Sequence, residues 1–178
     1  MPSRTIRERQ APLRERYAAD PTAAIQTLRV LGGGGDLSDP LHCAVGPAQL
    51  DVTWRSGAHP AVGGDDDVPC SGDLLLAALA ACQEITLRMV AANMGIEIRE
   101  LAIEVEGDWD ARGTLAMGRE YPVGIRTIRC HTSVVIDDDA HGDRATRLLR
   151  SAERYCVVLD TLRTGVDVDA TIEVRSGV

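Results

Sequence analysis

Cysteine is the residue type in this chain best suited to chemistry. The 178-residue sequence has five cysteines at wide, irregular spacings, with no CxxC pair. They are Cys43, Cys70, Cys82, Cys130 and Cys156. An odd number of cysteines behind an N-terminus with no hydrophobic signal core does not fit a secreted disulfide framework. Two cysteines have a histidine neighbour, but adjacent strand residues point to opposite faces, so we expect no metal site and no cofactor.

Cys82 lies near the middle of a predicted long helix, from Cys70 to Met94. Ser71 is the expected N-cap, Asp73 places a negative charge in the first turn, and Gly95 ends the helix. Leu75, Ala78, Leu79, Cys82, Thr86 and Met89 recur at spacings of three and four residues and so share one face. A helix that is apolar almost all round is a buried helix. Cys82 is therefore either a small apolar packing residue or a reactive thiol held in the core.

The other cysteines differ in what they can reach. Cys70 lies about 18 Å from Cys82 along the helix, which is too far for a disulfide. Cys156 lies at the entry to a second apolar helical segment, which tertiary packing can bring to Cys82. Cys130 is predicted to be a buried strand residue.

The remaining pattern predicts an α+β domain with a largely antiparallel sheet. Residues 41–54 indicate a hairpin turning at Gly46-Pro47, and 96–106 and 123–136 alternate as strands. A second helix is predicted over 140–154, continued or kinked over 155–162 and ended by Gly165, before a last strand over 166–174. We expect one domain over residues 41–178. Residues 1–40 are expected to be an arm that is solvated or wraps a partner, with a glycine hinge at 32–35.

Composition excludes several classes of partner. The formal charge of −8 argues against a nucleic-acid partner. The sequence has no run of 18 apolar residues, so we expect no membrane span. We expect a cytoplasmic protein with a core of Leu, Ile, Val and Ala, because Phe is absent. Three loop carboxylates, Asp65 to Asp67, are predicted to be a solvated turn, since calcium loops need spaced ligands. Glu84 and Arg88 are predicted to form a surface ion pair.

Several motifs together resemble the OsmC/Ohr family. The similarity covers roughly residues 40 to 176, and the order of its two cysteine motifs is fairly specific. The motifs are LLLAALAAC at 74–82, GIEI at 95–98, the E-G-D-x-D-x-R-G turn at 106–113, AERYCVV at 152–158 and T-L-x-x-G-V at 161–166.

The resemblance implies an intertwined α+β homodimer with antiparallel sheets around two central helices. It also implies thiol-dependent reduction of organic hydroperoxides. Cys82 matches the peroxidatic position and Cys156 the resolving one. The thiolate would attack the O–O bond, the sulfenic acid would condense with the second thiol, and an external dithiol would reduce the disulfide.

The chain departs from the family pattern at one position. Active members carry a Glu ten residues before the first cysteine, paired with an Arg from the N-terminal strands. Gly72 stands in the place of this Glu, and Arg29 and Arg55 are the candidates for the Arg. Candidate auxiliary groups are therefore Cys70, Asp73 and Arg55. The alternative function is a non-catalytic dimer that binds a small apolar ligand or senses oxidants.

Overall fold

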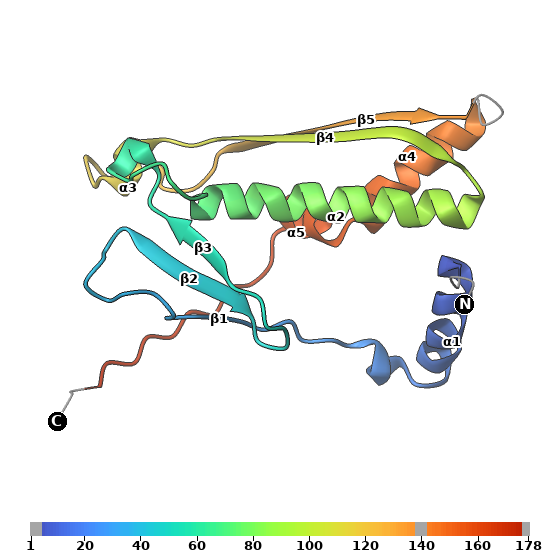
Figure 1. Ribbon diagram of the computed structural model, residues 1–178, viewed down its shortest axis with the longest axis horizontal. Coiled ribbons are helices and arrows are strands. Elements are labelled where there is room, and N and C mark those ends of the chain that lie inside the picture. Colours follow the sequence, from blue (N-terminus) through green and yellow to red (C-terminus); the bar gives the residue numbers. More distant parts are fainter. Residues whose placement is uncertain (1–4, 138–141, 176–178) are drawn as a thin grey trace.

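A computed structural model describes residues 5–137 and 142–175, arranged as an α+β fold around one long helix (Figure 1). The helix α2 spans Ser71–Met94. A hairpin of β4 (Ile98–Asp108) and β5 (Thr127–Ile136) lies along one side of it, and a smaller sheet of three strands lies on the other side. The predicted α+β class and antiparallel pairing are confirmed.

The three-stranded sheet consists of β1 (Val30–Gly32), β2 (His42–Pro47) and β3 (Trp54–Gly57). The predicted hairpin exists, but Gly46 and Pro47 belong to β2, where they pair with Leu31 and Val30. The turn instead occupies residues 48–53. Leu50, in this turn, is 65% exposed. The error arises because a Gly-Pro pair also suits a strand end, where the missing proline N–H costs nothing.

The segment predicted as an arm begins with a helix. The helix α1 spans Ile6–Ala19, and Thr5 and Glu8 form a capping box at its N-terminus. A 3-10 turn, η1, follows at Pro21–Ala24. Arg7 donates to the carbonyl oxygen of Asn93 at 2.8 Å, so α1 contacts the last turn of α2. Gly32, expected in a hinge, instead ends β1, and Gly33 takes the left-handed φ of 99°.

The N-cap of the central helix lies one residue earlier than predicted. Cys70, not Ser71, is the N-cap, and its backbone N–H donates to the Asp73 carboxylate at 2.8 Å. Gly95 ends the helix in the left-handed conformation, with φ of 64°. The predicted Glu84–Arg88 ion pair is present at 3.1 Å.

The carboxylates before the helix are only partly a solvated turn. Asp67 accepts from His42 at 2.9 Å and lies 3.8 Å from Arg55, so it joins β2 and β3 to the loop that contains the 3-10 turn η2 (Pro60–Val62). His42 also contacts Asp39 at 2.8 Å. The prediction missed this role because the partners lie more than ten residues away in sequence.

The two predicted strands pair as the β4–β5 hairpin, with shifted bounds: β4 begins and ends two residues later than predicted, and β5 begins four residues later. Its register runs from Ile98 opposite Ile136 to Asp108 opposite Thr127, with an irregularity near Ile98. The connection contains α3 (Ala111–Thr114), a single helical turn where a turn or bulge was expected. Inward side chains alternate along β5, as the sequence pattern predicted.

Two helices follow the hairpin. α4 spans Asp143–Tyr155 and α5 spans Val157–Thr164, with Cys156 extended between them at φ −77° and ψ 103°. The predicted start of the helix near Ala140 falls outside the described residues. Gly165 ends α5 as expected, with φ of 74°.

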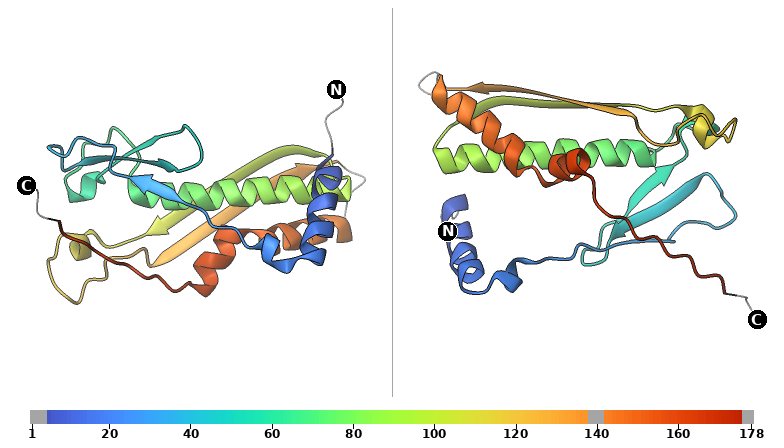
Figure 2. Two further views of the ribbon diagram at one scale, coloured as in Figure 1. Left: turned by 90° about the horizontal axis from the view of Figure 1, so that it is seen from below. Right: turned by 180° about the vertical axis from the view of Figure 1, so that it is seen from behind.

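The predicted last strand, 166–174, is not a strand in the described chain. The segment runs away from the helices (Figures 1 and 2), and Val168, Ile172 and Val174 are 82%, 93% and 91% exposed. Apolar and polar residues do alternate along the segment. A strand, however, must pair with the edge of a sheet, and the described part of this chain places no sheet edge beside it.

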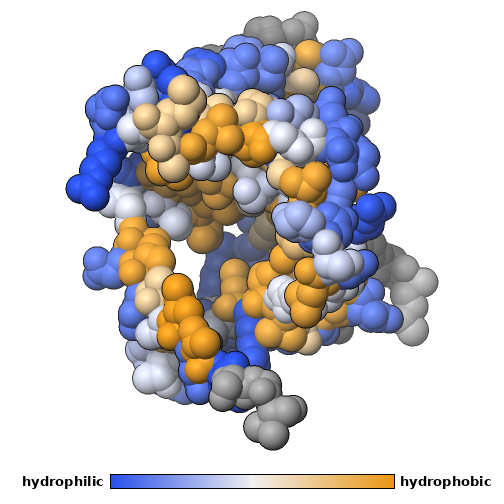
Figure 3. Space-filling model, turned by 90° about the vertical axis from the view of Figure 1, so that its left-hand side faces the viewer, coloured by the Kyte–Doolittle hydropathy of each residue, from blue (hydrophilic) through white to orange (hydrophobic). Residues whose placement is uncertain are grey.

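The main core lies at the C-terminal end of α2. Leu87 and Ala91 pack there against Ile96, Leu148 and Ala152. Elsewhere α2 is poorly covered: it is long and apolar enough to span a membrane by length and composition, yet only 22% of its apolar window is buried. The space-filling view shows apolar side chains around an open hollow (Figure 3). Exposed apolar patches of this kind are typical of interaction surfaces.

Candidate active site

The two cysteines singled out by sequence lie together in the structure. Cys82 is carried by α2, and Cys156 by the extended residue between α4 and α5. Both helices after β5 pack against α2, which brings the two thiols within hydrogen-bonding range of each other. Both thiols are free, Cys82 being half-buried and Cys156 fully buried.

Because the helix is interrupted at Cys156, the N-terminus of α5 points toward Cys82. The first N–H groups of a helix have no partner within it, and they favour a negative charge. Here the backbone N–H groups of Val157 and Val158 point toward the Cys82 sulfur. The hydroxyl of Thr86, one turn further along α2, approaches the same sulfur.

These donors decide which thiol ionises first. Burial raises the pKa of Cys82, but hydrogen bonds from the Val158 N–H, the Cys156 thiol and the Thr86 hydroxyl outweigh it and lower the pKa below its ordinary value. For Cys156, burial and the neighbouring Cys82 together raise the pKa. Of the two thiols, Cys82 therefore has the lower pKa and Cys156 the higher one.

The candidate auxiliary groups lie elsewhere. Cys70 and Asp73 cap the N-terminus of α2, about three turns from Cys82. The Arg55 side chain is 69% exposed and faces Asp67. The single chain does not bring any of the three to the thiol pair.

Sequence reasoning missed the donors that replace them. Thr86 was on the predicted face of Cys82, so its spacing of four residues was an available signal. The amides of Val157 and Val158 carried no side-chain signal, since any residue supplies an N–H. Only the break in the helix at Cys156 makes them available.

A cavity of about 460 Å³ lies beside the pair, between α1, α2 and α4. Thr86 and Tyr155, which adjoin the two cysteines, are part of its wall, together with Met89 and Val90. α1 contributes Gln10 and Arg14, which are joined by a hydrogen bond of 3.1 Å. The N-terminal segment thus encloses space next to the thiols.

Cys130 and Cys43 do not belong to this pair. Cys43 is exposed on β2. Cys130 is half-buried on the inward face of β5, where burial raises its pKa. Residues 5–137 and 142–175 hold no group of three or more His, Cys, Asp or Glu side chains arranged to bind a metal.

Comparison with known proteins points to one family. The family model described as OsmC-like protein matches residues 64–171. No curated protein matches the chain in sequence.

Solved structures of this family share the fold. The OsmC-like protein from Mycoplasma pneumoniae is 17% identical, with a TM-score of 0.61 over 79% of this chain and 89% of its own. An organic hydroperoxide resistance protein OsmC from Legionella pneumophila is 19% identical, with a TM-score of 0.57 over 80% and 93%. A hydroperoxide resistance protein from Elizabethkingia anophelis is 15% identical, with a TM-score of 0.57 over 79% and 91%. At these identities, the likeness establishes the fold.

Proposed function

This chain belongs to the OsmC-like protein family, and on that premise we propose that it reduces organic hydroperoxides through Cys82 and Cys156. One observation carries the proposal. The sulfur of Cys82 faces both the free N–H groups at the start of α5 and the thiol of Cys156. Two structural neighbours are named as hydroperoxide resistance proteins, which supports the same class of substrate.

The first step is attack of the Cys82 thiolate on the terminal oxygen of the hydroperoxide. The S–O bond forms as the O–O bond breaks, and the leaving alkoxide takes a proton to become the alcohol. Cys82 is oxidised to a sulfenic acid, and the peroxide is reduced. The N–H of Val158 stabilises the thiolate before attack. In the family pattern described above, an arginine would be the expected group for this role.

The second step joins the two sulfurs. The Cys156 sulfur attacks the sulfenic sulfur, a disulfide forms, and the sulfenic oxygen leaves as water with the thiol proton. An external dithiol then reduces the disulfide by thiol exchange and is itself oxidised. A fully buried Cys156 suits this role, because it meets only an oxidant already bound to Cys82.

The experiment counts thiols. One equivalent of cumene hydroperoxide is added to the reduced protein, and the remaining free thiols are then alkylated. Intact-protein mass spectrometry counts the alkylated thiols, and peptide mapping assigns them to cysteines. We expect loss of two thiols, mapped to Cys82 and Cys156 and restored by dithiothreitol. Peroxide consumption with dithiothreitol should stop in Cys82→Ser and persist in the control Cys43→Ser, whose cysteine is exposed on β2.

The Cys156→Ser variant separates the two steps. It should still consume one equivalent of peroxide and leave Cys82 as a sulfenic acid, which dimedone traps. Five free thiols after peroxide treatment would exclude the proposal. Oxidation confined to Cys70 or Cys130 would retain thiol chemistry but move it away from this site.

A further inference from the structure

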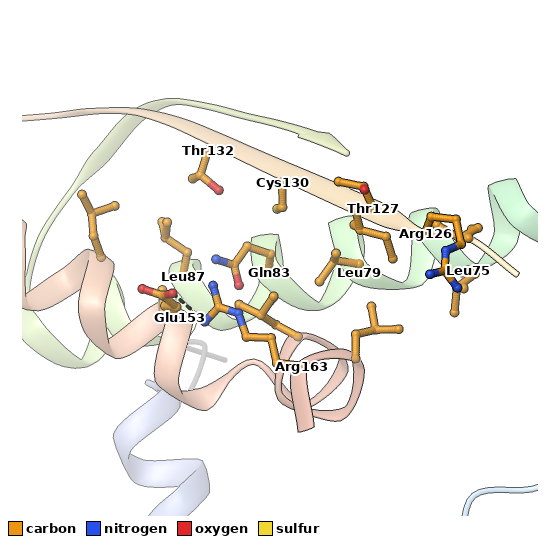
Figure 4. Close-up of a pocket in the computed structure, with 16 residues that line it drawn as sticks. Leu75, Leu79, Gln83, Leu87, Arg126, Thr127, Cys130, Thr132, Glu153 and Arg163 are labelled. Carbon is orange, nitrogen blue, oxygen red and sulfur yellow. Dashed lines mark ion pairs between the residues drawn. The ribbon is translucent and has the colours of Figure 1, made fainter. Parts of the chain in front are cut away.

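A second, larger cavity lies on another side of α2 (Figure 4). Its volume is about 710 Å³, within the range of about 300–1,000 Å³ found for small-molecule sites. It is enclosed by α2, the inward face of β5 and the helices α4 and α5. Neither Cys82 nor Cys156 is part of its wall.

Most of the wall is aliphatic. Leu75, Leu79 and Leu87 line it from one face of α2, at spacings of about one and two helical turns. Leu159 and Leu162 line it from α5. The chain has no phenylalanine to fill such a space. The aliphatic side chains that face this cavity lack packing partners on that side, so an apolar occupant would stabilise them.

Gln83 interrupts this aliphatic wall. Its side chain points into the cavity from the middle of α2, between Leu79 and Leu87 (Figure 4). Gln83 is only 8% exposed, and its Oε1 atom has no hydrogen-bond partner among the described residues. A buried amide oxygen without a donor is costly, and leucine at this position would avoid that cost. The oxygen is therefore placed to accept a hydrogen bond from a group that enters the cavity.

Two charged side chains lie at the open end of the cavity. Glu153 and Arg163 form an ion pair of 2.6 Å at its wall, and the two side chains are 49% and 59% exposed. These two groups satisfy one another. Arg126, Thr127 and Thr132 also line the cavity, and Gln83 Oε1 is the buried acceptor without a partner among the described residues. The chemistry is that of an apolar molecule with one neutral donor.

We propose that this cavity binds a small, mainly aliphatic molecule that carries a hydroxyl or N–H group, which donates to Gln83 Oε1. The aliphatic part lies against the leucines of α2 and α5. The site is separate from the thiol pair and does not depend on the proposed peroxidase activity.

Cys130 provides a reporter, because its side chain points into the same cavity from β5 (Figure 4). The rate at which iodoacetamide alkylates Cys130 is measured by peptide mass spectrometry on the reduced full-length chain. The probes are 1-octanol and its methyl ether, 1-methoxyoctane, which share the aliphatic chain and differ in the donor. We expect 1-octanol to slow alkylation of Cys130, and the ether to need about a tenfold higher concentration for the same effect.

Variants assign the effect to Gln83. In Gln83→Leu the two probes should act at similar concentrations, whereas the exposed control Gln49→Leu should behave as the wild type. The Cys82→Ser variant should keep the protection of Cys130 by 1-octanol, even if peroxide chemistry is lost or was never present. A circular dichroism spectrum and a thermal unfolding curve establish that each variant is folded.

Two results would overturn the proposal. Equal action of both probes on the wild type would show that Gln83 recognises no donor. No protection of Cys130 by either probe up to its solubility would show that the cavity is closed to small molecules, as it would be if a second copy of the chain filled it.

Discussion

At the scale of single residues, four hydrogen-bond donors lower the pKa of Cys82. Burial alone would raise its pKa and keep it a thiol. The N–H groups of α5, the Cys156 thiol and the Thr86 hydroxyl reverse the direction. Cys82 should therefore form a thiolate at a lower pH than Cys156 or Cys130, whose pKa values burial raises.

The contribution of Thr86 can be isolated by the Thr86→Val variant. Loss of the hydroxyl donor removes a hydrogen bond to the thiolate, so the pKa of Cys82 should rise. The rate of alkylation of Cys82 near pH 7 should fall about three- to tenfold, and its pH profile should move to higher pH. The measurement is the pH dependence of Cys82 alkylation by peptide mass spectrometry.

The matched control is Thr146→Val, an exposed threonine on α4. Its pH profile should coincide with that of the wild type. A Thr86→Val profile unchanged in pH would mean that the hydroxyl does not contact the thiolate, and that the backbone amides alone lower the pKa.

At the scale of secondary-structure elements, two helix termini perform different tasks. The N-terminus of α2 is closed by its own residues, because the Asp73 carboxylate accepts the N–H of Cys70. The N-terminus of α5 is instead directed at Cys82. Asp73, predicted as an auxiliary residue of the site, thus caps the helix, and its carboxylate bonds to the neighbouring Cys70 N–H.

The Asp73→Ala variant tests this assignment. Loss of the carboxylate leaves the Cys70 N–H without its partner and removes a negative charge from the first turn. We expect the free energy of unfolding to fall by about 1 kcal/mol, measured by urea denaturation. The rate of Cys82 alkylation should remain that of the wild type, since about two and a half helical turns separate the two residues. A clear loss of Cys82 reactivity without loss of stability would restore Asp73 to the active site.

At the scale of the whole molecule, one chain leaves much apolar surface uncovered. Ile85 on α2 is 56% exposed, and the alternating residues Val168, Ile172 and Val174 are almost fully exposed. An extended amphipathic segment of this kind is completed when it adds to a sheet edge. The family resemblance implies an intertwined homodimer, and we propose that a second copy covers these surfaces.

The dimer has a direct test. Light scattering after gel filtration should give a mass of twice the 19.1 kDa chain. The Ile172→Asp variant places a charge on the apolar side of the C-terminal segment and should shift the mass toward the monomer, with a concentration dependence. Thr171→Asp, on the polar side of the same segment, should remain dimeric. A wild-type chain that stays monomeric at high micromolar concentration would contradict the proposal.

Local patterns in the sequence were sufficient for much of this fold. The span of α2, the strands β4 and β5, the stop at Gly165 and the Glu84–Arg88 pair follow from periodicity, capping and spacing within a few residues. These features depend on neighbours along the chain, which is why one sequence predicts them. The family and its antiparallel α+β class also followed, because the two cysteine motifs occur in a fixed order.

The tertiary structure decided what depends on distant neighbours. It placed Cys156 and the first amides of α5 against Cys82, although more than seventy residues separate them in sequence. It moved Cys70, Asp73 and Arg55 away from that pair, joined Asp67 to His42, and left 166–174 without a strand partner. It also left the Gln83 oxygen in a cavity, without a hydrogen-bond partner in the described part of the chain. The physical reason is common to all of them: a backbone amide, a sheet edge or a cavity exists only where remote segments meet, and no local pattern encodes that meeting.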